Sequence, residues 1–176
     1  MLTVTIPDVE LFDEEKQEFL FIKGQTLSLE HSLVSLSKWE SKWKKPFLTK
    51  NEKTSEEIID YIRCMTITQN VNPIIYSGIG PEILKTIIEY MDDSMTATTF
   101  KDMDQKHSRE IITAEIIYYW MIELGIPFEC QKWHLNRLLT LINVCSIKQQ
   151  PPKKMSKKDA MAQQTKLNAA RRAKFK

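Results

Sequence analysis

The sequence has few cysteines, no long apolar run and no secretion signal at its start. Its three cysteines, Cys64, Cys130 and Cys145, are too few and too scattered for a disulfide framework, and their odd number fits a reducing compartment. No run of about 18 apolar residues exists, so no segment is predicted to span a membrane. The opening residues, MLTVTIPDVELFDEE, lack the basic start and the apolar stretch of a signal peptide. We therefore expect a soluble intracellular protein.

No catalytic constellation is evident either. The segment SGIGP, residues 77–81, places glycines before a predicted helix but lacks the Lys-Ser/Thr of a P-loop, and Pro81 removes a backbone donor that a phosphate would need. A cysteine nucleophile would need a histidine partner, yet His31 and His107 lie in segments predicted to be exposed. The acidic pairs 56–57 and 92–93 fall at predicted helix ends or in turns. These patterns favour a protein that is not an enzyme.

A metal site is equally weakly supported. Cys130 and His134 are four residues apart near the start of a predicted helix, and Cys145 follows. Zinc requires four ligands at recognisable spacing, whereas this set supplies three and contains no Cys-x-x-Cys pair. The alternative interpretation is two small apolar side chains and a surface or capping histidine. We expect no metal and no cofactor.

Charge divides the chain into two unequal parts. The net charge of the whole sequence is +2. From residue 153 onward, Asp159 is the one acid against nine basic residues, so this part carries +8 and the preceding 152 residues carry −6. The nine are Lys153, Lys154, Lys157, Lys158, Lys166, Arg171, Arg172, Lys174 and Lys176. Such asymmetry is typical of an interaction arm joined to a folded body.

The first 27 residues predict a small β element. Leu2, Val4 and Ile6 alternate with threonines, the period of a half-buried strand. A second strand is predicted over Glu18–Lys23, which is rich in aromatic and β-branched residues and is followed by Gly24. Two or three short strands are not stable alone in water, so we expect them to pack on helices.

From Ser28 the apolar period changes to that of a helix. Ser28 is a candidate N-cap for a first helix, whose apolar stripe runs from Leu29 to Trp43. Thr54 or Ser55 is the candidate N-cap of a second helix, and Pro81 suits the first turn of a third. SREIITAEIIYYWMIELG, residues 108–125, is apolar on nearly every side, which predicts a central, buried helix ending at Gly125, and a further helix is expected over 131–145. The predicted fold is mainly α: a small β element over 1–27, a domain of about five helices over 28–150, and a basic helical arm over 151–176.

Tryptophans and basic residues supply the candidate binding sites. Trp39 and Trp43 lie one helical turn apart in a basic stretch, and tryptophan is enriched in binding hot spots. Because they continue the leucine stripe, a role in the domain's own core is favoured over contact with a partner. The candidate partner-binding residues are Trp39, Trp43, Trp133, Lys153, Lys154, Lys157, Lys158, Arg171 and Arg172.

Three interpretations of the arm stay open. Its charge would attract nucleic acid, but Phe175 is its one aromatic residue and no recognition motif accompanies it. Folding of the arm on an acidic protein partner, or on the acidic body of a neighbouring subunit, accounts for the pattern as well. Protein binding is favoured, nucleic-acid binding is second, and a merely solvated end is third.

Four stretches together resemble small proteins encoded among the virion morphogenesis genes of tailed bacteriophages, the tail assembly chaperones. They are HSLVSLSKWESKWKKPFL, TSEEIIDYIRCMT, the segment from SREIITAEIIYYW to LINVC, and the closing PPKKMSKKDAMAQQTKLNAARRAKFK. The resemblance covers most of residues 28–176 and rests on overall pattern, not on a mechanistic signature.

The resemblance implies a non-enzymatic protein of the host cytoplasm. Such a chaperone binds the tape measure protein, keeps it soluble while the tail tube polymerises around it, and leaves as tube subunits arrive. The alternatives are a structural virion component, such as a neck, connector or tail protein whose strands augment a ring, and a nucleic-acid-binding regulator that acts through the arm.

Overall fold

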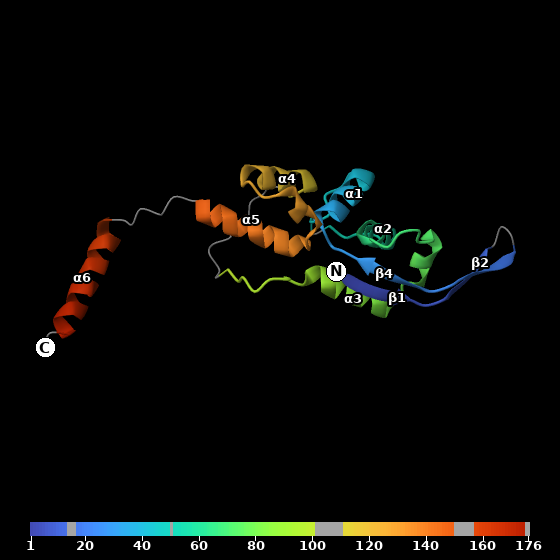
Figure 1. Ribbon diagram of the computed structural model, residues 1–176, viewed down its shortest axis with the longest axis horizontal. Helices are drawn as coiled ribbons and strands as arrows, with labels where there is room; N and C mark the ends of the chain where they lie inside the picture. The colour runs from blue at the N-terminus through green and yellow to red at the C-terminus, as the bar shows by residue number, and fades with distance from the viewer. Residues whose placement is uncertain (14–16, 50, 101–110, 150–156, 175–176) are drawn as a thin grey trace. The chain divides into compact units, whose positions relative to one another are not determined.

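The computed structural model describes residues 1–13, 17–49, 51–100, 111–149 and 157–174 (Figure 1). The chain divides into two units, residues 1–145 and 146–176, and each is described by itself. Most described elements are helices, and the strands lie at the N-terminus, so the prediction of a mainly α fold with a small N-terminal β element is confirmed.

The strands form one long interrupted hairpin. Strand β1 (Leu2–Ile6) pairs antiparallel with β4 (Gln25–Leu29), and β2 (Val9–Asp13) pairs antiparallel with β3 (Glu18–Ile22). The two ladders are separated at Gly24, where an added Cβ would lie 2.5 Å from the Ile6 carbonyl oxygen. The Gly24 N–H donates to Asp8 Oδ1 at 2.6 Å, which closes the interruption. The element thus has four strands, where the sequence predicted two or three.

Ser28 lies in β4, so the prediction that it caps the first helix was wrong. Helix α1 spans Leu33–Trp43 and begins at Ser32, whose hydroxyl accepts from Ser35 N–H while the Ser35 hydroxyl accepts from Ser32 N–H. Leu27 and Leu29 are fully buried on one face of the strand. Leu29 fits the period of a strand with Leu27 and the period of a helix with Leu33 and Leu36, and that ambiguity explains the error.

Three further helices complete the first half of the helical body. Helix α2 spans Ser55–Met65 and is capped by Thr54 through a capping box with Glu57, as one of the two predicted caps. A short 3₁₀ helix, η1 (Pro73–Gly78), precedes α3 (Pro81–Asp92), which has proline in its first turn as predicted.

Helix α4 spans Ala114–Glu123, so Ile111 and Ile112 precede it, and the predicted start at Ser108 lies outside the described residues. Gly125 follows it with φ +65°, the left-handed conformation that ends helices. The helix buries only the stripe Ala114, Ile117 and Met121. The prediction of a central, fully buried helix was wrong, because α4 packs on α1 from one side and leaves Tyr119 and Ile122 exposed.

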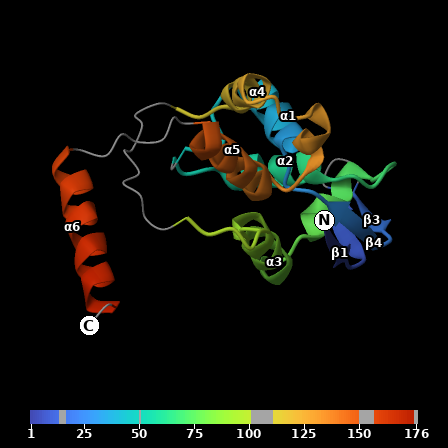
Figure 2. The same ribbon diagram turned by 60° about the vertical axis from the view of Figure 1, so that its left-hand side comes forward.

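The last elements are the 3₁₀ helix η2 (Phe128–Lys132), α5 (Leu135–Gln149) and α6 (Lys157–Lys174). Within residues 1–145, α1 contacts α2, α4 and η2, and β1 contacts α3 and η1 (Figures 1 and 2). The strands therefore share one core with the helices, as a two-stranded ribbon in water requires.

Residues 28–32, the strand–helix junction, join β4 to three other elements. Glu30 N–H donates to the Met65 carbonyl at 2.9 Å, and Ile67 N–H donates to the Ser28 carbonyl at 2.8 Å, which fixes the end of α2. Leu135 N–H donates to the His31 carbonyl at 2.7 Å, which fixes the start of α5. These hydrogen bonds fix the positions of β4, α1, α2 and α5 relative to one another.

A buried carboxylate ties α1 to α4. Glu40 lies on the inner face of α1, and its two oxygens accept from Phe47 N–H at 2.8 Å and from Ala114 N–H at 2.7 Å. Ala114 is the first residue of α4, so Glu40 satisfies a backbone donor that the helix itself leaves unpaired. The negative charge also lies at the positive end of the α4 dipole.

Gly78 allows the hairpin to approach η1. A Cβ at this position would lie 2.4 Å from Val9 Cγ2 and 2.9 Å from Ile6 Cγ2, whereas a Cβ at Gly80, the N-cap of α3, would meet nothing within 4 Å. Val9 and Ile6 are buried and β-branched, so neither side chain yields easily.

We predict that Gly78→Ser lowers the free energy of unfolding by about 1–3 kcal/mol, the usual cost of overpacking. The matched control Gly80→Ser should change it by less than about 0.5 kcal/mol, because serine is a good N-cap residue with room at this site. Urea denaturation of the two variants measures the difference. Equal destabilisation would show that the hairpin does not pack on η1 as described.

Candidate protein-binding surfaces

Trp39 lies in the core and not on a binding surface. Its side chain is 1% exposed, and its indole N–H donates to the Glu57 carbonyl at 2.9 Å. Its ring packs edge-on against Phe47, which in turn stacks on Tyr61 with ring centroids 3.7 Å apart. The structure therefore supports the core interpretation of Trp39 and removes it from the candidate partner-binding residues.

Trp43 is half-buried and belongs to a polar contact between α1 and α2. Its indole N–H donates to Asp60 Oδ2 at 2.8 Å, while the Lys42 ammonium pairs with the other oxygen of the same carboxylate. Burial alone would raise the pKa of Asp60, but the hydrogen bonds from Lys42 and Trp43 outweigh it and hold that pKa below its ordinary value. Trp43 is thus fixed in place with part of its ring in solvent.

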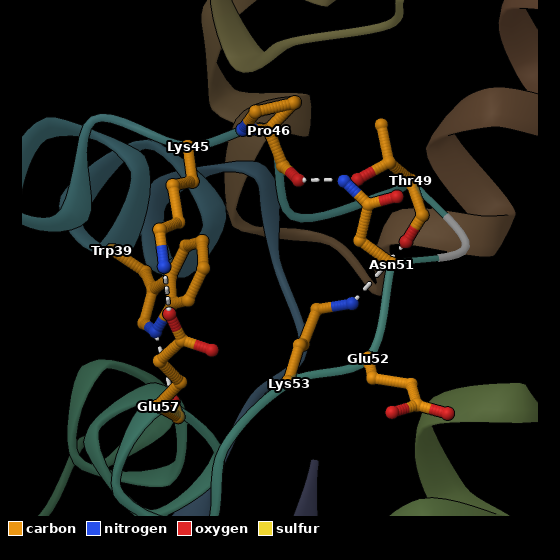
Figure 3. A pocket seen from close by; sticks show the side chains of 8 residues that line it. All are labelled: Trp39, Lys45, Pro46, Thr49, Asn51, Glu52, Lys53 and Glu57. Carbon is orange, nitrogen blue, oxygen red and sulfur yellow. Dashed lines mark hydrogen bonds and ion pairs between the residues drawn. The ribbon is translucent and has the colours of Figure 1, made fainter.

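Next to this contact lies a pocket of about 350 Å³ (Figure 3). It is lined by Trp39, Lys45, Pro46, Thr49, Asn51, Glu52, Lys53 and Glu57. Lys45 crosses it to donate to Glu57 Oε1 at 2.6 Å, and this hydrogen bond, together with one from the Thr54 backbone, lowers the pKa of Glu57. Lys53 lies over the Phe47 ring at 4.7 Å and donates to the Thr49 carbonyl.

Two lysines and two glutamates line this pocket, and both lysines have partners within it. Glu57 was expected to serve the α2 dipole, and it does so while also accepting from the Thr54 N–H and from Lys45.

His31 and His134 are both buried, so the prediction that His31 lies in an exposed segment was wrong. His31 is 4% exposed because it belongs to the strand–helix junction, and its Nδ1 lies 2.6 Å from the Tyr61 hydroxyl. His134 donates from Nε2 to the Tyr90 carbonyl at 3.0 Å, and its buried Nδ1 has no hydrogen-bond partner within the described chain. The two imidazole rings meet edge to face, with centroids 5.2 Å apart.

Cys130 is buried and Cys145 half-buried, and both pack against the core, as the interpretation without a metal expects. His134 is buried and not a surface residue, which corrects that part of the interpretation. Among the residues that the structure describes, no three His, Cys, Asp or Glu side chains come together as a metal site. His107 lies outside those residues.

Trp133 is half-buried at the start of α5, and the Arg137 guanidinium lies 4.4 Å from its ring centre. Stacked arginine and tryptophan form a planar surface that suits contact with a protein. Of the three predicted tryptophans, Trp43 and Trp133 therefore retain exposed area, Trp43 at the end of α1 and Trp133 between η2 and α5.

Within unit 146–176, α6 is exposed at every position whose side chain is described, including Arg171 and Arg172. Met161 and Leu167 are the large apolar residues exposed on it. The predicted residues Lys157 and Lys158 begin the helix, and Lys153 and Lys154 lie outside the described residues.

The sequence reasoning missed an aromatic face on the hairpin. Phe12, Phe19 and Phe21 are 47%, 70% and 67% exposed, and the rings of Phe12 and Phe19 are 5.0 Å apart. The signal was present in EFLFI, where two phenylalanines two positions apart in a strand must share a face. Alternation predicts which residues share a face but not which face is covered.

Comparison of the chain with protein-family models, with curated proteins and with solved structures finds no match. None of the described helices combines the length and the apolar character needed to cross a bilayer. The candidate surfaces must therefore be interpreted from their own chemistry.

The buried histidines make stability depend on pH. Burial, and secondarily the neighbouring His134, lower the pKa of His31 to about 3, and burial also lowers the pKa of His134. Each favours the neutral form in the folded state, while the unfolded chain takes up protons below about pH 6.5. The stabilisation is complete above pH 6.5 and is lost as the pH falls toward 3.

We predict that His31 alone accounts for a loss of about 1 kcal/mol in unfolding free energy between pH 6.5 and 5.5. In His31→Gln the decrease over this interval should be smaller by that amount, whatever the absolute stability of the variant. Denaturant titrations at the two pH values measure both slopes. Identical slopes would mean that the pKa of His31 in the folded protein is not lowered from its value in the unfolded chain.

Proposed function

We propose that the protein is a tail assembly chaperone of a tailed bacteriophage. In this role it binds the tape measure protein and tail tube subunits during tail morphogenesis in the host cytoplasm, and it transforms no substrate. The proposal joins the resemblance of residues 28–176 to the surfaces described above. The observation that carries it is the exposure of helix α6. Its described side chains are all exposed within their unit, and the helix is rich in cations that a partner could contact.

An exposed helix of this kind is suited to a partner. The 18 residues of α6 include strong helix formers but bury no described side chain within their unit, and most helical stability in proteins comes from packing of a helix face and not from propensity. Packing against another chain would supply the missing stabilisation. We therefore assign the basic arm, residues 151–176, to partner binding, with Arg171 and Arg172 as its exposed arginines and Lys153, Lys154, Lys157 and Lys158 as additional cations.

The mode of binding also fits a transient role. An arm that orders on its partner binds with modest affinity for its area and can be displaced as a competing subunit arrives. The half-buried Trp43 and Trp133 supply aromatic area on the body for helices of an elongated partner.

A structural virion component is the second candidate. In the described residues, β1, β2 and β3 are each paired with one strand only and present an edge that could extend a sheet in a ring, whereas the end of β4 also bonds to residues 65–67. Binding of nucleic acid through the arm ranks below both, because residues 1–152 carry −6 and would repel a phosphate backbone.

We predict that co-expression keeps the tape measure protein of the same genome in the soluble fraction and that the two proteins co-purify. The double variant Arg171→Glu/Arg172→Glu should reduce the co-purified amount at least about tenfold, because two contacts become repulsive. The matched control Lys85→Glu/Lys132→Glu changes the net charge equally at exposed positions of α3 and η2 and should bind normally.

Quantitative immunoblots of the soluble fraction and of the purified complex measure these amounts. If the wild-type chain neither solubilises nor retains the tape measure protein, the proposed function is wrong. If both double variants lose binding equally, the contact is non-specific charge attraction and not a contact of the arm.

A further inference from the structure

The hairpin β2–β3 has one covered face and one open face. In its register Phe12 pairs with Phe19 and Glu10 pairs with Phe21, so these four residues share a face. On the opposite face Val9 is buried and Ile22 half-buried, and Val9 packs over Gly78 of η1. The face with the three phenylalanines, here the Phe face, therefore points away from the core of residues 1–145.

An open surface of this composition marks an interaction site. Phe19 and Phe21 are each about two-thirds exposed, and no described residue of unit 1–145 covers them. Three neighbouring phenylalanines on a short ribbon form a contiguous apolar patch, which soluble proteins rarely leave uncovered without a partner. A hairpin of two five-residue strands is itself marginal in water, so covering the face also stabilises the ribbon.

The charge around the Phe face defines what can cover it. Residues 8–23 contain six acidic residues and two lysines, so this hairpin carries −4 of the −6 that the sequence places before residue 153. Glu10 lies on the Phe face, whereas Glu18 pairs with Asp13 on the opposite face and is exposed at the start of β3. The ligand must therefore bring cations together with apolar or planar side chains.

Helix α6 has the required chemistry. Residues 157–174 contain six basic residues and one acid, a charge of +5, with Met161 and Leu167 as exposed apolar side chains. Arginine guanidinium groups stack on phenylalanine rings, and the stems of lysine cover apolar surface while their ammonium groups reach carboxylates. At about 1.5 Å per residue, α6 is roughly 27 Å long, and it exceeds the roughly 17 Å of a five-residue strand.

We propose that the Phe face of one copy binds helix α6 of a second copy. Each of the two surfaces is exposed within its own unit, so each copy can offer its Phe face to one neighbour and its α6 to another. Arg171 and Arg172 lie against Phe19 and Phe21, and the remaining cations of α6 face the acidic residues of the hairpin. This self-association is measured on the chain alone, without the tape measure protein, so its failure and the failure of the proposed function are separate results.

Sedimentation velocity on the full-length chain at low ionic strength tests the proposal. The wild-type chain should sediment as a dimer or larger species that dissociates at high salt. Phe19→Ser/Phe21→Ser and Arg171→Glu/Arg172→Glu should each be monomeric at concentrations where the wild type is associated. Tyr119→Ser/Ile122→Ser, which removes two equally exposed apolar side chains from α4, and Lys85→Glu/Lys132→Glu should associate like the wild type.

A charge exchange makes the test specific. Glu10→Lys/Glu18→Lys should be monomeric alone, and mixing it with the monomeric Arg171→Glu/Arg172→Glu variant should restore a heterodimer, because the exchanged charges are again complementary. Circular dichroism of each variant checks that the fold is intact. A wild-type chain that stays monomeric at all concentrations, or a mixture that fails to associate, overturns the proposal.

Zero-length cross-linking separates a second copy from the same chain. In an equal mixture of unlabelled and ¹⁵N-labelled wild-type protein, peptides joining Lys166 to Glu10 or Glu18 should include pairs with one labelled and one unlabelled partner. Cross-links confined to identically labelled pairs would show that α6 contacts its own hairpin, and that result contradicts the proposal.

Discussion

The strand–helix junction, residues 28–32, is the constraint on which the body of the protein depends. Within five residues the chain finishes β4, bonds to the end of α2 through Ser28 and Glu30, bonds to the start of α5 through the His31 carbonyl, and begins α1 at Ser32. The His31 side chain adds a contact with Tyr61 of α2. Because the segment is buried, each of these polar groups must be paired within the protein, and a shift of one residue would break several pairs at once.

The charged side chains fall into two groups: those that are paired within the body and those that are exposed on the hairpin and on α6. In the body, Glu40 holds α4, Asp60 is paired with Lys42 and Trp43, and Glu57 is paired with Lys45. The hairpin and α6 instead present their charges together with exposed apolar residues. A surface that combines exposed charges with exposed apolar side chains is suited to macromolecular contact, whereas paired and buried charges stabilise the fold.

Local signals in the sequence predicted the helices best where a cap or a proline decides the boundary. Thr54 or Ser55 located the start of α2, Pro81 the first turn of α3, and Gly125 the end of α4. Ser28 failed because Leu27 and Leu29 satisfy a strand period that only pairing with β1 selects. The apolar composition of α4 indicated a buried helix, but its position at the edge of the body leaves Tyr119 in solvent.

The candidate surfaces were predictable only in part. The charge of the arm is a property of the sequence alone, whereas the burial of His31 and of Trp39 depends on contacts between segments far apart in the chain. The Phe face shows the same limit, because alternation places Phe19 and Phe21 together but does not reveal that η1 covers the other side of the ribbon.

Quantitative mass spectrometry of purified phage particles and of the lysate from which they were prepared tests the assignment as an assembly chaperone most directly. The account predicts that the protein is abundant in the lysate, where tails are being built, and absent from mature particles, because it leaves as the tube closes. A fixed number of copies in every purified particle would contradict it and would identify a structural component instead.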